Sequence, residues 1–512
     1  MKTKKFIPFI QRKADTAIRL GTEKVRQLRS PKKYKTIGFF VNYLSRGVTL
    51  TVNDKARQLL DIVVPQVCIT DSRFFPKGSI CLILSEDDAP KAMRRGASVL
   101  LSNKDLADYP CIVSDNPLGS YARLIRYFRD LKADMPVTAV TGSIGKTTVK
   151  NMIGEVYKRR CKVFYSDSTN NTKKFIGFVA QHIPAWAEIL LQEVDESGFN
   201  ETEWISEMLN PDVVVITAID KSHFQYFESA DKIVENVCSI TKRMKEDGTV
   251  IVNEDEFERM DLLNGRKTLT VSTRHEDADF YASDIIMDND GLKFIVHQKT
   301  SSNQYEVRLY NMFAPHNVTC ALYAFACGIC EGIDPRAIVE GLSKFRTSGV
   351  RQNVIRDKNN VLIYADCYNA VGRSMKSAID TCDSIPVKGK RIAVLGDVEE
   401  TGSESEQMHR DIVRYVDESK FDILYTVGEK TKNAASCTTF RNSLLVKSFL
   451  DLVSLRSELS KLIEKDDMVL FKASHAVNLD KVIMELWPEM AKDLFVDLDR
   501  KYEKWYRRTL RY

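Results

Sequence analysis

Residues 141–148, Thr-Gly-Ser-Ile-Gly-Lys-Thr-Thr, combine phosphate-binding residue types in the spacing typical of a P-loop. A strand-like apolar run precedes them and a helical pattern follows. Gly142 and Gly145 let backbone N–H groups point inward, and the N-terminus of the new helix adds positive dipole. We expect Lys146 to reach the β- and γ-phosphates, and the Thr147 hydroxyl to lie where a nucleotide-bound Mg²⁺ takes an oxygen ligand. The stretch therefore predicts binding of a nucleotide with Mg²⁺; the alternative is a glycine turn that opens an ordinary helix.

Short apolar runs alternate with helical patterns along the chain, which indicates an α/β protein with mostly parallel sheets. At 512 residues the chain is too long for one hydrophobic core, and its length suggests three units. The uncharged stretch 311–330 is interpreted as a buried helix. We predict a basic lead over 1–33, a small α/β domain over 34–135, a central P-loop domain over 136–347 and a third α/β domain over 348–512.

The composition is ordinary for a globular enzyme, with 44% hydrophobic and 28% charged residues. A net charge of +5 is too small to indicate nucleic-acid binding. Eleven scattered cysteines, an odd number, favour a reducing compartment over a disulfide framework. Since no segment resembles a secretory signal or a membrane span, we expect a cytoplasmic protein. We also expect a monomer.

Positive charge gathers at both ends of the chain. Residues 1–35 hold twelve Lys and Arg against two acidic residues, and the stretch 500–512 mixes Arg and Lys with Tyr and Trp. Solvated amphipathic helices are the interpretation that we favour for both. Weak contact with an anionic membrane surface or with a protein complex is the alternative.

A P-loop by itself indicates a nucleotide but not a reaction, and further motifs narrow the choice. These are Thr70-Asp-Ser-Arg73, Arg95-Gly-Ala97, Pro315-His-Asn-Val318, Tyr364-Ala-Asp-Cys-Tyr-Asn-Ala370, Leu395-Gly-Asp397 and Val469-Leu-Phe-Lys-Ala-Ser474. The P-loop also follows a separate predicted domain, residues 34–135, and does not lie near the N-terminus. With these motifs in this order, the chain resembles the Mur ligases over nearly its whole length. These ATP-dependent enzymes form the amide bonds of the peptidoglycan stem peptide. The motifs after residue 360 are most similar to the branch that adds D-alanyl-D-alanine.

The resemblance implies a three-domain Mur ligase architecture. Residues 34–135 would bind a UDP-sugar, the central parallel-sheet domain would bind ATP, and residues 348–512 would form a Rossmann-like ligase domain. The implied reaction is ATP-dependent amide formation through an acyl phosphate, with ATP and Mg²⁺ as cofactors. Its best-matched substrates are a UDP-N-acetylmuramoyl tripeptide, the UDP-linked sugar-peptide precursor, and the dipeptide D-alanyl-D-alanine.

The resemblance also assigns site residues. Glu193 ends the apolar run 189–192 and is placed to bind Mg²⁺ beside Thr147. His223 matches the family histidine that holds a second metal, with a surface histidine as the alternative. The catalytic residues implied are Lys146, Glu193 and His223, and the metal ligands are Thr147, Glu193 and His223. ATP would contact Gly142, Ser143, Gly145, Lys146, Thr147, Thr148, Asn317, Arg351 and Asp366. The other substrates would contact Ser72, Arg73, Lys173, Lys174, Asn369 and Lys472.

The chain departs from the family pattern mainly on the acceptor side. Lys173 and Lys174 stand where the D-alanyl-D-alanine branch has two asparagines. The lysine that many members carbamylate to hold the second Mg²⁺ falls on Val237, which cannot ligate a metal. Two alternatives therefore stay open. One is a Mur-like ligase for another acid or amine, in which the two lysines bind extra carboxylates. The other is a non-catalytic ATP-binding scaffold of cell-wall synthesis.

Overall fold

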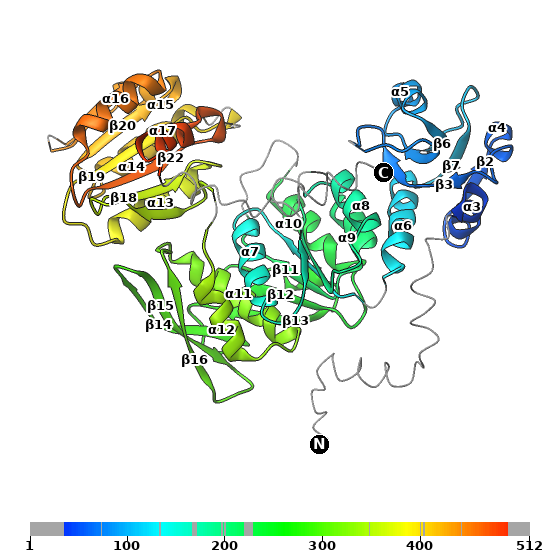
Figure 1. Ribbon diagram of the computed structural model, residues 1–512, viewed down its shortest axis with the longest axis horizontal. Coiled ribbons are helices and arrows are strands. Elements are labelled where there is room, and N and C mark those ends of the chain that lie inside the picture. The colour runs from blue at the N-terminus through cyan, green and yellow to red at the C-terminus, as the bar shows by residue number, and fades with distance from the viewer. Residues whose placement is uncertain are drawn as a thin grey trace.

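The computed structural model describes residues 35–72, 74–132, 135–165, 171–195, 198, 201–219, 229–347, 349–399, 401–402, 405–441 and 443–489. These residues form three α/β bodies, each built on its own sheet (Figure 1). We call them the N-terminal body (35–132), the central body (135–347) and the C-terminal body (349–489), with main sheets of five, nine and six strands. The basic lead and the stretch 500–512 lie outside the described residues.

The N-terminal body has the strand order β2-β7-β6-β5-β4, so β4 lies at an edge of its sheet. The strands are β2 (Leu50–Val52), β4 (Val67–Ile69), β5 (Ser79–Leu82), β6 (Ala97–Ser102) and β7 (Cys111–Ser114). The helices are α3 (Ile37–Leu44), α4 (Asp54–Arg57), α5 (Ala89–Arg94) and α6 (Pro117–Asp130). A separate two-stranded pair is formed by β1 (Lys35–Thr36) and β3 (Val63–Val64). Helix α6 begins where the Asn116 side chain accepts a hydrogen bond from the Gly119 amide. Its apolar side packs into the same core as Ile80 and Val99.

The central body is a mostly parallel sheet in the order β16-β15-β14-β13-β12-β11-β8-β10-β9. Its strands are β8 (Val137–Thr141), β9 (Val163–Tyr165), β10 (Ile189–Glu193), β11 (Val213–Ile216), β12 (Thr249–Asn253), β13 (Lys267–Ser272), β14 (Phe280–Asp288), β15 (Gly291–Gln298) and β16 (Gln304–Tyr310). The neighbouring strands β8 and β10 are buried throughout, because helices cover both faces of the sheet. They run parallel, so the segments that follow Thr141 and Glu193 meet at one edge.

Six helices of the central body fall within the described ranges: α7 (Lys146–Tyr157), α8 (Lys173–Gln181), α9 (Glu201–Leu209), α10 (Ala230–Cys238), α11 (His316–Cys330) and α12 (Pro335–Lys344). Helix α11 packs against α7, and most of its side chains are buried. This confirms a buried helix over 316–330, whereas residues 311–315 of the uncharged stretch precede the helix and are not part of it. None of the helices in the described residues has the length and apolar character required to cross a membrane.

The C-terminal body has the order β17-β18-β22-β19-β20-β21, in which only the β17–β18 pair is antiparallel. The strands are β17 (Asn353–Arg356), β18 (Leu362–Asp366), β19 (Arg391–Gly396), β20 (Ile423–Val427), β21 (Leu445–Phe449) and β22 (Met468–Lys472); the helices are α13 (Gly372–Ser384), α14 (Ser405–Asp417), α15 (Glu429–Ser436), α16 (Leu452–Leu462) and α17 (Leu479–Leu486). Asp366 and Lys472 end adjacent parallel strands and are register partners. The end of this sheet therefore presents an acid and a base side by side.

The bodies touch at defined points. Met287 and Phe313 of the central body pack into the apolar core of the C-terminal body. Arg373 pairs with Glu256 across the same junction, with 3.1 Å between Nη2 and Oε1. On the other side, Gln181 at the end of α8 reaches β4 of the N-terminal body. All eleven cysteines are free, in agreement with the expectation of no disulfide framework.

Candidate functional site

The P-loop has the backbone shape that its glycines predict. Gly142 has a φ of +120° and Gly145 a φ of +87°, both in the region that other residues avoid. A Cβ at Gly142 would lie 2.3 Å from the Thr217 hydroxyl oxygen, so only glycine fits. The Ser143 and Ile144 amides donate to the Ala218 carbonyl, at 2.9 and 3.0 Å, which fixes the loop to the end of β11. The first-turn amides of α7 then face the space beyond the loop.

Glu193 lies at the centre of a polar cluster beneath this loop. Its Oε1 accepts hydrogen bonds from the Thr147 hydroxyl at 3.3 Å and from the Asn171 amide at 3.2 Å. Its Oε2 lies 3.4 Å from the Lys150 ammonium. Asp195 follows along the chain and lines the same space. Hydroxyl and carboxylate oxygens are the ligands that Mg²⁺ prefers, so Thr147, Glu193 and Asp195 form a donor set that fits this ion.

The C-terminal body supplies the opposite wall. Lys472 Nζ lies 2.9 Å from Asp366 Oδ2 and donates to the Asn369 carbonyl at 2.6 Å. The other carboxylate oxygen of Asp366, Oδ1, accepts a hydrogen bond from the backbone N–H of Gln352 at 3.2 Å. The Arg351 guanidinium lies over the Tyr368 ring, 3.6 Å from its centre, in a cation–π contact that favours this position. Arg351 thus presents its charge to the space between the bodies.

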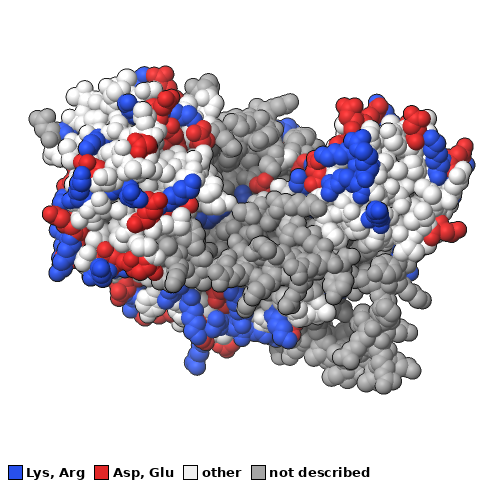
Figure 2. Space-filling view, turned by 45° about the horizontal axis from the view of Figure 1, so that its top comes forward, with Lys and Arg blue, Asp and Glu red and all other residues white. Residues whose placement is uncertain are grey.

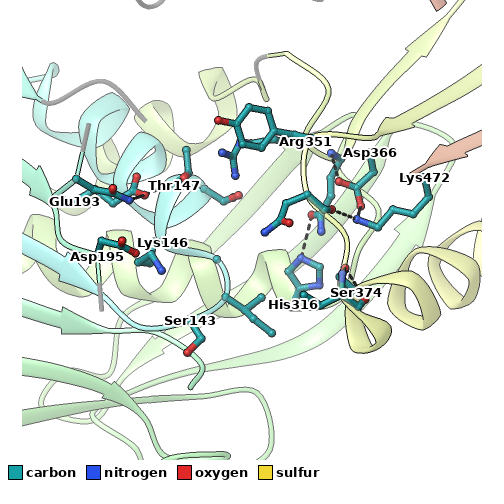
Figure 3. Close-up of a pocket in the computed structure, with 18 residues that line it drawn as sticks. Ser143, Lys146, Thr147, Glu193, Asp195, His316, Arg351, Asp366, Ser374 and Lys472 are labelled. Carbon is teal, nitrogen blue, oxygen red and sulfur yellow. Dashed lines mark hydrogen bonds and ion pairs between the residues drawn. The ribbon is translucent and has the colours of Figure 1, made fainter. Parts of the chain in front are cut away.

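One cavity of about 400 Å³ joins the two walls (Figure 3). Lys146, Thr147, Glu193 and Asp195 project from the central body, and Arg351 projects from the other side. Its size is within the range of small-molecule sites. The residues that line it are Ser143, Ile144, Gly145, Lys146, Thr147, Thr148, Asn171, Glu193, Asp195, His316, Arg351, Gln352, Asp366, Tyr368, Asn369, Val371, Ser374 and Lys472.

His316 forms the floor where α11 begins. Its Nε2 lies 3.0 Å from the Gln352 side-chain oxygen. Burial lowers the pKa of the His316 imidazole from its usual 6.5, and the hydrogen bond that the ring donates to Gln352 Oε1 opposes this only in part. The ring is therefore neutral at pH 7. Asn317 beside it is buried, and its Oδ1 has no hydrogen-bond partner among the described residues.

The structure thus brings ten of the residues predicted from sequence into one cavity: Ser143, Gly145, Lys146, Thr147, Thr148, Glu193, Arg351, Asp366, Asn369 and Lys472. Gly142, which is part of the loop itself, and Asn317, which follows His316 on α11, do not line the cavity. Arg73 and His223 lie outside the described residues. The roles assigned to all of these side chains stay predictions.

Three of the residues predicted to contact the other substrates, Ser72, Lys173 and Lys174, do not line the cavity. Lys173 forms an ion pair with Glu201 on α9, so its charge is already balanced inside the chain. Lys174 is exposed, and its charge is one of those that lower the pKa of Asp71, after the hydrogen bond from Lys91. Lys174 therefore faces the N-terminal body.

The turn that holds Ser72 is fixed by other groups. Ser72 Oγ accepts from the Ile69 amide at 3.1 Å. Arg95 Nη1 donates a hydrogen bond to the Thr70 carbonyl and Nη2 donates one to the Ser72 carbonyl, both at 2.5 Å. The same guanidinium lies over the Phe75 ring. Ser72 therefore shapes a rigid turn, and its hydroxyl is engaged within it.

Sequence reasoning gave no role to several cavity and near-cavity residues. Gln352 and Lys150 are the clearest cases, since each supports a predicted site residue. Lys150 has a signal in the sequence, because it follows Lys146 by four positions and so shares its helix face. Gln352 has a φ of +52° and lies in a loop, and no pattern in the sequence predicts its place.

Comparison with known proteins agrees with this geometry. The Mur ligase middle domain matches residues 140–328, and the Mur ligase glutamate ligase domain matches residues 350–475, so together they span most of both walls of the cavity. The chain belongs to the Mur ligase family. The resemblance inferred from the motifs and the Mur ligase fold are therefore confirmed, and the chain is a ligase of this family.

Two relatives carry the name UDP-N-acetylmuramoyl-tripeptide--D-alanyl-D-alanine ligase. The protein of Bacillus subtilis (strain 168) is 29% identical over 404 residues, which are 77% of this chain and 86% of the relative. That of Escherichia coli (strain K12) is 24% identical over 429 residues, 81% of this chain and 92% of the relative.

Solved structures share the fold. MurF from Acinetobacter baumannii superimposes with a TM-score of 0.70 at 22% identity, covering 90% of this chain and all of that one. MurF from Thermotoga maritima in complex with ADP gives a TM-score of 0.66 at 22% identity, covering 84% of this chain and 98% of that one. At such identities these structures establish the architecture alone.

Proposed function

We propose that this Mur ligase joins the free carboxylate of a UDP-N-acetylmuramoyl tripeptide to the amine of D-alanyl-D-alanine, with hydrolysis of ATP to ADP and phosphate. The observation that carries the proposal is the two-walled cavity, in which a P-loop with Lys146 and Glu193 faces Arg351 and Lys472. The names of the relatives support the choice of substrates.

The proposed reaction needs no protein nucleophile. The substrate carboxylate attacks the γ-phosphorus of ATP, and ADP leaves to give an acyl phosphate. The amine then attacks the acyl carbon, and phosphate leaves as the amide forms. Both steps spread negative charge over phosphate oxygens, so the protein's task is to align the reactants and to neutralise that charge.

The residues present suit this task. Lys146 and the first-turn amides of α7 would hold the phosphates from one wall. Arg351, in contact with the Tyr368 ring, would bring a positive charge from the other wall. Asp366 orients Lys472 and the Gln352 amide through the contacts described above. Because the two walls come from different bodies, their approach would also exclude water from the acyl phosphate.

Mg²⁺ would be held by the Thr147 hydroxyl and the Glu193 carboxylate, with Asp195 nearby. When bound, Mg²⁺ neutralises charge on the phosphates of the nucleotide. Glu193 is already oriented for this role, because Thr147 and Asn171 both bind its Oε1.

We also propose the domain division over 34–135, 136–347 and 348–512, with the first domain binding the UDP-sugar. Figure 2 shows Lys and Arg gathered on the N-terminal body at its side toward the middle of the molecule. Such a surface suits the diphosphate of a UDP-sugar. The ordered turn at 70–72 lies in the same body, at the end of β4.

The test is release of ADP and phosphate from ATP and Mg²⁺ by the purified protein, with each substrate omitted in turn. We expect release only when both the UDP-linked tripeptide and D-alanyl-D-alanine are present, together with an amide product of the corresponding mass. Release with other acids or amines, and none with this pair, would reject the substrate assignment while keeping the ligase.

One observation favours a second candidate, a protein that binds ATP without turnover. Val237, in the register of the family's carbamylated lysine, is completely buried in an apolar cluster with Ile233 and Ile240. No metal ligand is available from that position. Tight ATP binding with no release for any substrate pair would favour this candidate.

A further inference from the structure

Lys150 is a charged side chain buried beneath the candidate phosphate site. It lies on α7 one turn after Lys146, and only 1% of its surface is exposed. Its ammonium lies 3.4 Å from Glu193 Oε2, and the two side chains are each 2% exposed. Desolvating an ammonium and a carboxylate is costly, so such a pair persists only where its geometry is well determined.

The two oxygens of Glu193 have different partners. Oε1 is bound by the Thr147 hydroxyl and the Asn171 amide, whereas Oε2 faces Lys150. The partners come from the start of α7, from the segment before α8 and from the second turn of α7. This arrangement leaves the carboxylate one orientation, with Oε1 on the Thr147 side. Thr147 lines the cavity.

Charge around the site gives Lys150 a second effect. The cavity is lined by three cations, Lys146, Arg351 and Lys472, and by three carboxylates, Glu193, Asp195 and Asp366. Lys150 adds a fourth positive charge just behind Glu193. A bare Mg²⁺ therefore meets a carboxylate whose charge is already balanced, whereas a nucleotide brings several negative charges of its own and reverses the balance.

We propose that Lys150 is a positioning residue for the metal site. Its ammonium is an internal counter-ion that orients Glu193 toward Thr147 and weakens binding of Mg²⁺ in the absence of nucleotide, so that the metal arrives with ATP. The proposal rests on the proposed function in one respect, namely that Thr147 and Glu193 hold Mg²⁺.

The experiment measures melting temperatures of the full chain without ligand, with Mg²⁺ alone, with ADP alone and with both. Four variants are compared with the wild type: Lys150→Met, Lys150→Arg, Glu193→Gln and the double variant Lys150→Met/Glu193→Gln. Lys344→Met is the matched control, because it removes a lysine from an exposed ion pair with Glu340.

Lys150→Met should melt roughly 10 °C below the wild type, since it leaves Glu193 buried without its counter-ion. Mg²⁺ alone should then stabilise it, at concentrations about tenfold or more below those that affect the wild type. The double variant should recover much of the lost stability and lose the response to Mg²⁺. Lys150→Arg should keep the wild-type response, and the control should match the wild type throughout.

Two results would overturn the proposal. One is a Lys150→Met variant whose response to Mg²⁺ equals that of the wild type. If the role of Lys150 were only structural, its loss would lower the melting temperature and leave the response to Mg²⁺ unchanged. The other is a double variant in which the two losses of stability simply add. A wild type that does not respond to Mg²⁺ with ADP would instead reject the nucleotide site, and with it the proposed function. The double-mutant cycle formed by Lys150→Met, Glu193→Gln and the double variant is measured without ligand. It therefore tests the interaction between Lys150 and Glu193 independently of the nucleotide site.

Discussion

The link between the N-terminal and central bodies gives the sharpest prediction for a single side chain. Gln181, 8% exposed, donates to the Val67 carbonyl at 2.9 Å and accepts from the Val67 amide at 2.8 Å. Val67 begins the edge strand β4, so these backbone groups have no neighbouring strand on that side. The Gln181 amide therefore acts as the missing strand partner, and its nitrogen also donates to the Gly177 carbonyl at 3.0 Å.

Gln181→Met keeps the length of the side chain but removes both hydrogen bonds to Val67, which is 1% exposed. Each buried group left without a partner costs about 1–3 kcal/mol, so the loss for the N–H and C=O groups together is about 2–6 kcal/mol. Urea unfolding should show this as a lower midpoint. Gln304→Ala, at an exposed position of β16, is the control and should change stability by no more than about 0.5 kcal/mol.

The same variant should act selectively on substrates. β4 leads directly into the turn at residues 70–72, in the body proposed to bind the UDP-sugar. We therefore expect the KM for the UDP-linked substrate to rise severalfold while the KM for ATP stays close to that of the wild type. Loss of less than about 1 kcal/mol of stability, or equal changes in both KM values, would refute the assignment of Gln181 as the link between the bodies.

Three further predictions concern the cavity itself. Lys146→Met should reduce ADP release by roughly a hundredfold or more while the melting temperature without ligand stays within a few degrees of the wild type, as measured by steady-state kinetics and thermal unfolding. Gly142→Ala should abolish ADP binding by calorimetry and destabilise the fold, because its Cβ would lie 2.3 Å from Thr217 Oγ1 at a φ of +120°; unchanged binding would contradict the loop geometry. His316, whose pKa is lowered from 6.5 by burial, binds a proton more readily in the unfolded chain, so stability should fall as the pH drops through about 6.5 and level off below the folded pKa. The variant His316→Gln should lose that part of the pH dependence in urea titrations at pH 5 to 8, and an unchanged slope would contradict it.

The parts of the site that lie on one continuous motif could be predicted from the sequence. Strand β8, the glycine loop and helix α7 are consecutive, so the P-loop and the place of Lys146 followed from local rules. Glu193 could be placed because it ends a strand, and parallel strands bring their carboxyl ends to one edge. Arg351 and Asp366 were found only through the family motifs, since nothing local distinguishes them from ordinary ion-pair residues.

Long-range contacts could not be predicted in the same way. The sequence shows Lys173 and Lys174 as two cations in place of two amides, which suggested binding of extra carboxylates. In the structure, Glu201 on α9 balances Lys173, from a position 28 residues away along the chain. No periodicity relates these two positions, so the partner becomes visible only once α8 and α9 are packed together.

Helix α8 explains how the site and the N-terminal body are held in a fixed relation. Asn171, two residues before the helix begins, binds Glu193 in the cavity, and Gln181, its last residue, binds the edge strand of the N-terminal body. The helix has nine residues, which corresponds to a length of about 13 Å. Lys173 adds the contact with α9 near the first end. A rigid element of this length, fixed at both ends, sets the separation between the candidate metal site and the edge of the body proposed to bind the UDP-sugar. Loss of the Gln181 contact should therefore displace the edge of that body relative to the metal site, which is the physical reason for the expected selective rise in the KM for the UDP-linked substrate.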